Sequence, residues 1–325
     1  MKQQIKNLAG SMQSFSRETY HRDELISEEL ALQAEMAGIV FGEEAEGKRV
    51  WDVYNRLVEL NAHYKGVASD SLERFKIGCS FLTNEICGAI SGRKGEQKAL
   101  KSLQTLKCKH RILHNVELEF DGHRTELDAV VFTKKAVFIV EVKNTKRNVL
   151  IDENGNMQRY CMADGTYKFD AYLGLKMRDK EYVLRQALQK SDYKDAPIVS
   201  LVVFTDSTIK VVNDYSYITT CSLSTLPHLI EKNVGHNQYS SDEINNMVEA
   251  VKQSQTDQMY KAPQEIEEMK EAFWETILVL KEAQRAIEAK KNWFKNLWSG
   301  VKKYAAPTAA AVGALTVGLF LVGKR

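Results

Sequence analysis

Asp128, Glu141 and Lys143 are the residues whose types and spacing could carry out chemistry. They lie in two apolar runs, residues 126–132 and 137–143, which four residues separate. Two carboxylates held close together repel each other, and a divalent cation would remove that repulsion, because carboxylate oxygens suit Mg²⁺ or Mn²⁺. A neighbouring lysine could then stabilise charge that develops on a phosphate or help to activate a water molecule.

The two runs predict a β-hairpin whose loop takes some or all of Thr133-Lys134-Lys135-Ala136. Every loop length considered gives the same register, in which Asp128 falls opposite Glu141 and Glu126 opposite Lys143. Strict period-two alternation then places all four charged residues on one face, at one end of the hairpin. Both faces are otherwise apolar, as in interior strands covered on each side. The alternative is an ion pair of Lys143 with Glu126 or Glu141 that only fixes the register.

The elements that must position these residues mix strands with helices between residues 89 and 235. A helix is expected at about 95–106 and another around Tyr182, Leu184 and Leu188. Strand-like runs lie between and after them, and the mixture predicts one α/β domain. The expected strands are 112–120, 125–132, 137–142, 149–151, 198–204, 209–212 and 217–220.

Helical segments are expected on both sides of this domain. Residues 1–88 read as a polar helical accessory region, and residues 240–304 as a helical or coiled-coil segment. Ser240 and Glu243 fit a capping box at the start of the second segment. Its seam of apolar residues either packs on the chain's own domain or forms a homo-oligomer. The seam residues stand seven apart: Ile266, Phe273, Leu280, Ile287, Phe294 and Val301.

An uncharged stretch at residues 305–323 is close to the length that spans a bilayer. Lysines and aromatic residues precede it at 290–304, as they do at membrane interfaces. We therefore expect a C-terminal hydrophobic anchor, a single-pass transmembrane helix at the cytoplasmic membrane. Because the flanking lysines favour the inner side, residues 89–235 would lie in the cytoplasm. The alternative is a cytoplasmic protein whose tail docks in a protein groove.

Charge and cysteine content exclude some classes of protein. The net charge of +2 gives no global field that favours nucleic acid, but residues 89–150 hold 13 Lys/Arg against 7 Asp/Glu. Five scattered cysteines without a CxxC pair argue against a zinc cluster and indicate free thiols. The chain has no Gly-rich P-loop, so nucleotide hydrolysis is not supported.

The pattern Asp…Glu-x-Lys across a hairpin resembles the PD-(D/E)xK nuclease superfamily, and the longer string resembles its NERD (nuclease-related domain) members. The matching pieces are Gly92-Arg-Lys-Gly95-Glu96 at a helix, Glu126-Leu127-Asp128, Val137 to Asn144, and Arg185-Gln186. The proline that names the superfamily is absent, and Leu127 precedes the Asp, as is usual in the NERD subset. The resemblance covers roughly residues 90–220.

The resemblance implies an α/β, restriction-endonuclease-like mixed sheet core flanked by helices. It assigns catalytic roles to Glu96, Asp128, Glu141 and Lys143, with Gln186 as an auxiliary residue on a later helix. Asp128, Glu141, Glu96 and the backbone carbonyl of Val142 would be the ligands of Mg²⁺ or Mn²⁺.

The function that follows is a metal-dependent nuclease that hydrolyses phosphodiester bonds of DNA or RNA, with DNA favoured over RNA. The alternative belongs to another class. In that interpretation the domain is a catalytically silent nucleic-acid-binding or scaffold module, and it oligomerises through its helical ends. Alanine at Glu141 separates the two, because only a nuclease would lose its function.

Overall fold

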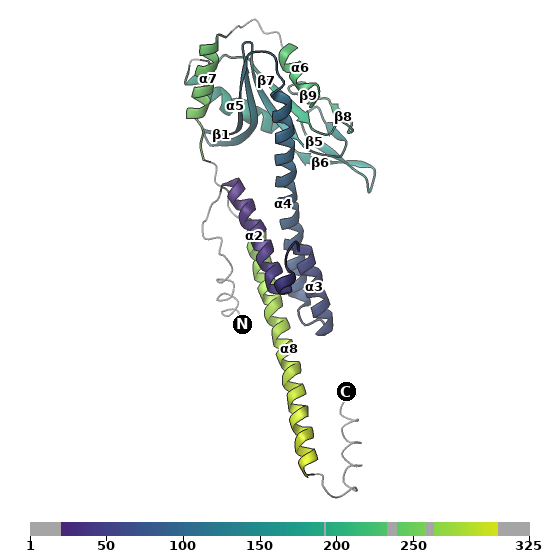
Figure 1. Cartoon of the computed structure of the whole chain (residues 1–325). Helices are drawn as coiled ribbons and strands as arrows, with labels where there is room; N and C mark the ends of the chain where they lie inside the picture. The colour runs from purple at the N-terminus through teal and green to yellow at the C-terminus, as the bar shows by residue number, and fades with distance from the viewer. Residues whose placement is uncertain (1–20, 192, 233–238, 258–259, 261–262, 305–325) are drawn as a thin grey trace. The chain divides into compact units, whose positions relative to one another are not determined.

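The computed structural model describes residues 21–191, 193–232, 239–257, 260 and 263–304 (Figure 1). The chain divides into two compact units. One consists of Met1–Glu18, Ser27–Thr83 and Ala262–Arg325, and the other of Thr19–Ile26 and Asn84–Lys261. The second unit, here called the α/β unit, holds every strand of the described residues and the candidate site.

The main sheet of the α/β unit has five strands in the order β1-β2-β3-β7-β9. Strands β1 (His110–Phe120), β2 (His123–Thr133) and β3 (Val137–Lys143) are antiparallel neighbours. Strands β7 (Ile198–Phe204) and β9 (Thr219–Ser222) continue the sheet in parallel with β3. The mixed α/β sheet predicted from the sequence is therefore confirmed, and each of these strands overlaps a run that the sequence indicated.

A second sheet has the order β6-β5-β4-β8. Strands β4 (Val149–Ile151) and β8 (Val211–Asn213) were expected, whereas β5 (Met157–Cys161) and β6 (Thr166–Ala171) were not. These two strands are short and polar, and their register shifts between Met157 and Gln158, so the period-two pattern that marks a strand is weak.

Helices cover both faces of the main sheet. Helices α5 (Leu173–Gln189) and α7 (Ser241–Gln253) pack on one face, in a core with Val130, Phe132, Val137 and Ile139. The expected capping box at Ser240 and Glu243 begins α7, which packs on strands β1 and β2 and on α5. The other face packs on Ala99 and Leu103 of helix α4 (Ser69–Leu103) and on helix α6 (Leu226–Lys232). Strands apolar on both faces are explained by these two layers.

The β2–β3 hairpin has the predicted register, in which Phe132 pairs with Val137 and Ala129 with Val140. The strict alternation predicted for residues 126–132 is wrong. Leu127 and Val130 both belong to the core on the α5 side, so alternation breaks at Asp128. Glu126 is therefore turned to the α4 side, away from the face of Glu141.

The break coincides with an unusual residue on the neighbouring strand. Asn115 of β1 stands opposite Asp128, yet it is the one residue of β1 without a pairing partner in β2. Its φ of 52° lies in the left-handed region, which asparagine tolerates better than most residues. The next left-handed pair, Asp121 and Gly122, forms the tight turn between β1 and β2, as Asp-Gly often does.

The first unit, here called the helical unit, consists of helices. It contains most of α2 (Arg22–Phe41), the 3-10 turn η1 (Gly42–Glu44), α3 (Val50–His63), the first part of α4, and α8 (Gln264–Tyr304). The long helix predicted after Pro263 is confirmed as α8.

The seam of α8 divides into two halves. Ile266, Phe273 and Leu280 are buried, and the Phe273 ring lies 5.5 Å from that of Phe75, so this half packs inside its own unit. Ile287 and Phe294, further along, are 38% and 52% exposed. Self-association through the seam stays a prediction.

No helix in the described ranges is both long and apolar enough to cross a membrane. The anchor predicted at 305–323 lies outside those ranges.

The backbone at Asn115 can be tested by two substitutions. Asn115→Gly should leave the free energy of unfolding unchanged or higher, because glycine adopts positive φ freely. Asn115→Ala should lower it by about 1 kcal/mol, since alanine lacks the short polar side chain through which asparagine tolerates this conformation. Urea denaturation measures both. Equal losses in the two variants would mean that the amide side chain, and not the backbone, matters for stability.

Candidate active site

Asp128 stands where the ladder between β2 and β3 ends. The last backbone pair is Ala129 with Val140. Beyond this pair, the Val142 N–H donates to Oδ2 of Asp128 at 2.7 Å. The side-chain carboxylate therefore replaces the backbone carbonyl of β2 that would accept this hydrogen bond in a regular ladder. This hydrogen bond holds the Asp128 carboxylate against β3, beside Glu141.

Glu141 lies between two lysines. Its Oε1 accepts from Nζ of Lys143 at 2.6 Å, and its Oε2 accepts from Nζ of Lys180, on α5. The same Lys180 Nζ lies 3.5 Å from Oδ1 of Asp128. The side chains of Lys180 and Glu141 are only 8% and 7% exposed, whereas Lys143 is 21% exposed. Lys180 is therefore the cation that bridges the two carboxylates.

The pKa values follow from this arrangement. Burial alone would raise the pKa of Glu141, but the ammonium groups of Lys180 and Lys143 outweigh it and lower the pKa to about 2. Burial would likewise lower the pKa of Lys180, and the two carboxylates raise it. The pKa of Asp128 is raised instead. Burial makes the larger contribution, and the negative charge of Glu141 makes the next largest. Glu141 and Lys180 thus form the ionised centre of the cluster.

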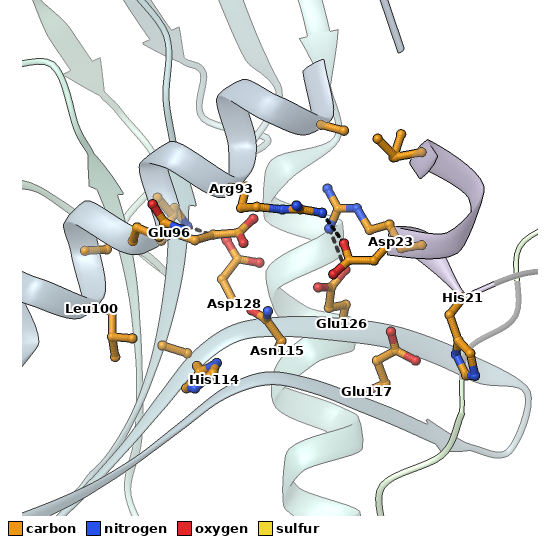
Figure 2. Close-up of a pocket in the computed structure, with 17 residues that line it drawn as sticks. His21, Asp23, Arg93, Glu96, Leu100, His114, Asn115, Glu117, Glu126 and Asp128 are labelled. Carbon is orange, nitrogen blue, oxygen red and sulfur yellow. Dashed lines mark hydrogen bonds and ion pairs between the residues drawn. The ribbon is translucent and has the colours of Figure 1, made fainter. Parts of the chain in front are cut away.

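Asp128 also faces a pocket of about 470 Å³ on the α4 side of the sheet. Figure 2 shows Glu96 of α4 and Asp128 pointing toward each other there, with Asn115 beside Asp128. Val142 lines the same pocket, as do His114 and Glu117 of β1.

The N-terminal turn of α2 closes one side of the pocket, within the same unit. Arg22 donates to Oε2 of Glu126 at 3.0 Å, and Asp23 pairs with Arg93 of α4 (Figure 2). Burial and then the negative charge of Asp128 raise the pKa of Glu96, against the opposing effect of Arg22. The pocket is thus acidic, and part of its charge is balanced by arginines.

The predicted residues fall into three groups. Glu96, Asp128 and Val142 share the pocket. Glu141 and Lys143 adjoin Asp128 from the α5 side. Gln186 does not line this pocket; it lies six residues beyond Lys180 on α5, turned about a third of a turn away around the helix. Of the residues of α5, Lys180 contacts the carboxylates of Asp128 and Glu141, and the auxiliary role of Gln186 stays a prediction.

A sequence signal for Lys180 existed. The residues of α5 that are buried against the sheet are spaced three or four apart, and Lys180 occupies one of these core positions between Met177 and Leu184. A lysine in an apolar helical stripe needs a buried partner, because an unpaired charge there is costly. Arg22 and Asn115 gave no comparable signal, since one is far away in sequence and the other depends on its backbone conformation.

The kind of donor atom at the site suits Mg²⁺ or Mn²⁺, because the cluster offers carboxylate oxygens and a backbone carbonyl. Each oxygen of Asp128 and Glu141, however, already has a nitrogen partner within the chain. Across the residues with described positions, no group of three or more His, Cys, Asp or Glu is arranged to hold a metal ion. The donor set fits a divalent cation in chemistry, and the ammonium of Lys180 lies between the two carboxylates that would hold it.

The comparison with protein families agrees with this geometry. Residues 91–205 match the family model described as NERD, the nuclease-related domain. Residues 91–205 are therefore similar to a nuclease-related domain, and Glu96, Asp128, Glu141 and Lys143 all fall inside this stretch. No curated protein and no solved structure matches the chain.

The repulsion between Glu96 and Asp128 predicts a gain in stability from Glu96→Gln. The raised pKa of Glu96 means that its neutral form favours folding and that this contribution is lost as the pH rises. At pH 7 the variant should be more stable by up to about 1 kcal/mol. The difference should vanish below a pH of about 4, where the wild-type carboxyl is protonated in both states.

Urea denaturation at the two pH values measures this effect. Glu153→Gln, at an exposed acid of the same unit, serves as the matched control and should change nothing. A Glu96→Gln protein that is less stable at pH 7 would contradict the assignment of repulsion.

Proposed function

We propose that this chain is a metal-dependent nuclease that hydrolyses phosphodiester bonds of nucleic acid, with DNA favoured over RNA. The observation that carries the proposal is the meeting of Asp128, Glu141 and Lys143 at the end of a covered sheet, inside a nuclease-related domain. Glu96 adds a further carboxylate from α4, across the pocket from β2.

In this proposal Asp128, Glu141, Glu96 and the Val142 carbonyl hold Mg²⁺ or Mn²⁺. The bound cation would supply Lewis-acid stabilisation of the phosphate and favour ionisation of water. The protein's own contribution is to orient the reactants. Lys143 keeps its ammonium on Glu141, from where it can polarise the attacking water and stabilise the charge that develops on the pentacoordinate phosphorus of the transition state. The pocket beside Asp128 would accept the substrate phosphate.

Exposed cations around the site support a polyanionic substrate. Lys94 and Lys98 on α4 and Lys146 and Arg147 after β3 are all exposed. Lysines and arginines that contact phosphates bind nucleic acid through release of counterions, without reading its sequence. The proposal therefore implies binding that weakens as salt rises.

The test is cleavage of labelled single- and double-stranded DNA and RNA by the full chain in mild detergent, with Mg²⁺, Mn²⁺ or EDTA. We expect cleavage that requires the metal and falls by about 100-fold or more in Lys143→Ala, because one stabilising group at the reacting phosphate is lost. Lys168→Ala, an exposed lysine on β6, should cleave like the wild type. Cleavage that persists in Glu141→Ala and in EDTA would refute the proposal.

A second candidate is a catalytically silent nucleic-acid-binding or scaffold module. One observation favours it, namely that the ammonium of Lys180 pairs with both Asp128 and Glu141. The exposed half of the α8 seam, with Ile287 and Phe294, would then serve as the oligomerising surface. Folded protein that binds nucleic acid and cleaves none of the four substrates would support this candidate.

We further propose that residues 305–323 tether the protein to the cytoplasmic membrane, with the nuclease-related domain on the cytoplasmic side. The support is the uncharged stretch itself and the lysines and aromatic residues that precede it. A cytoplasmic protein is the alternative.

Removal of residues 305–325 tests the tether. The full chain should sediment with membranes and resist extraction by high salt, and the shortened chain should stay in the supernatant, because a span of this length dominates membrane affinity. Immunoblots of the two fractions measure the distribution. A full chain found in the supernatant would exclude the anchor.

A further inference from the structure

We propose that Lys180 is a built-in competitor for the metal: its ammonium holds the position between Asp128 and Glu141, and a divalent cation binds there only when it displaces Lys180. The inference rests on the proposed function, and it names the residue that sets the metal affinity of the site.

The first argument is position. Among the residues that the structure describes, Lys180 alone contacts both carboxylates, with Nζ 3.5 Å from Oδ1 of Asp128 and in hydrogen-bond contact with Oε2 of Glu141. A cation shared by two carboxylates is the arrangement expected of a metal ion at this site. Lys143 contacts only Glu141 and is more exposed, so it can stay in place when a metal binds.

The second argument is charge. Asp128 and Glu141 together carry two negative charges when ionised, and Lys180 and Lys143 carry two positive charges. A divalent cation added to these four groups would leave them with a net positive charge, of which Glu96 across the pocket could offset only a part. Because buried charge is costly unless it is paired, the cation must take the place of an ammonium group.

The third argument is attachment. Lys180 belongs to α5, and Met177, Leu184 and Ala187 fix that helix in the core of the α/β unit. The ammonium is therefore presented to the carboxylates by a rigid element, and its effective concentration is that of an intramolecular ligand. An exposed lysine that entered from solvent would be a much weaker competitor.

The experiment measures Mn²⁺ affinity on the full chain in mild detergent, by isothermal titration calorimetry and by the loss of the free-Mn²⁺ signal in electron paramagnetic resonance. Three proteins are compared at pH 7: wild type, Lys180→Met and Lys176→Met. Methionine keeps a similar side-chain length and shape and removes the positive charge. Lys176 is exposed one turn earlier on α5 and serves as the matched control.

We expect Lys180→Met to bind one Mn²⁺ at least about tenfold more tightly than wild type and the control, in the range of ordinary coupling between two competing ligands. Its unfolding temperature should fall without metal, because two carboxylates lose their counter-charge, and should recover with Mn²⁺. Wild type should show little change with Mn²⁺. If Lys180→Met does not fold without metal, refolding it with Mn²⁺ and repeating the comparison with Lys180→Gln provide the same readout.

The other outcomes are distinct. Equal Mn²⁺ affinity in wild type and Lys180→Met would overturn this inference and leave the proposed nuclease intact. Weaker affinity in Lys180→Met would also overturn it and would make Lys180 a positioning residue for the carboxylates. Absence of Mn²⁺ binding in all three folded proteins would overturn both the inference and the metal dependence of the proposed function.

Discussion

The buried ion cluster of Lys180, Glu141 and Asp128 is the interaction on which the site depends. Two carboxylates at the end of a sheet covered by helices would repel each other and lose their hydration, so they need counter-charges from the chain. Loss of one partner of such a buried pair costs roughly 3–5 kcal/mol, a large part of the stability of a typical domain. The register of β2 against β3 and the rotation of α5 about its axis are therefore both constrained by charge as well as by apolar packing.

The irregularity at Asp128 gives this cluster access to solvent. In a regular strand Asp128 would face α5 only, and the α4 side would hold only its neighbours. Because alternation breaks opposite Asn115, the carboxylate contacts Lys180 on one side and lines the pocket with Glu96 on the other. Backbone strain of this kind concentrates at functional sites, where the surrounding structure enforces it. The fold thus connects a buried ionic centre to an open acidic pocket through one residue.

The sequence was most informative where the pattern was local. Apolar, strand-forming runs predicted β1, β2, β3 and β7, and the register of the hairpin predicted Asp128 opposite Glu141. The hydrophobic pattern missed β5 and β6, whose polar residues and register shift hide the period. The break at Asp128 depends on a single backbone angle, and the contact of Arg22 with Glu126 joins residues about a hundred positions apart. A local hydrophobic period carries no information about either the break at Asp128 or the contact of Arg22 with Glu126. Lys180 lies outside the motif that carries the family resemblance, and only its place in the apolar stripe of α5 marks it in the sequence.

The two candidate functions differ in how firmly one ammonium group is held. The same residues form the site in both, and the lowered pKa of Glu141 keeps that carboxylate ionised at any physiological pH. If the proposed nuclease is correct, its activity depends on whether a divalent cation in the cell can replace Lys180, which is a competition between two cations for one pair of carboxylates. A rigid α5 favours the lysine, and nucleic acid bound in the pocket would favour the metal, because its phosphate adds negative charge beside Asp128. Substrate and metal would on this account bind cooperatively, so that a site nearly silent alone becomes competent when both are present.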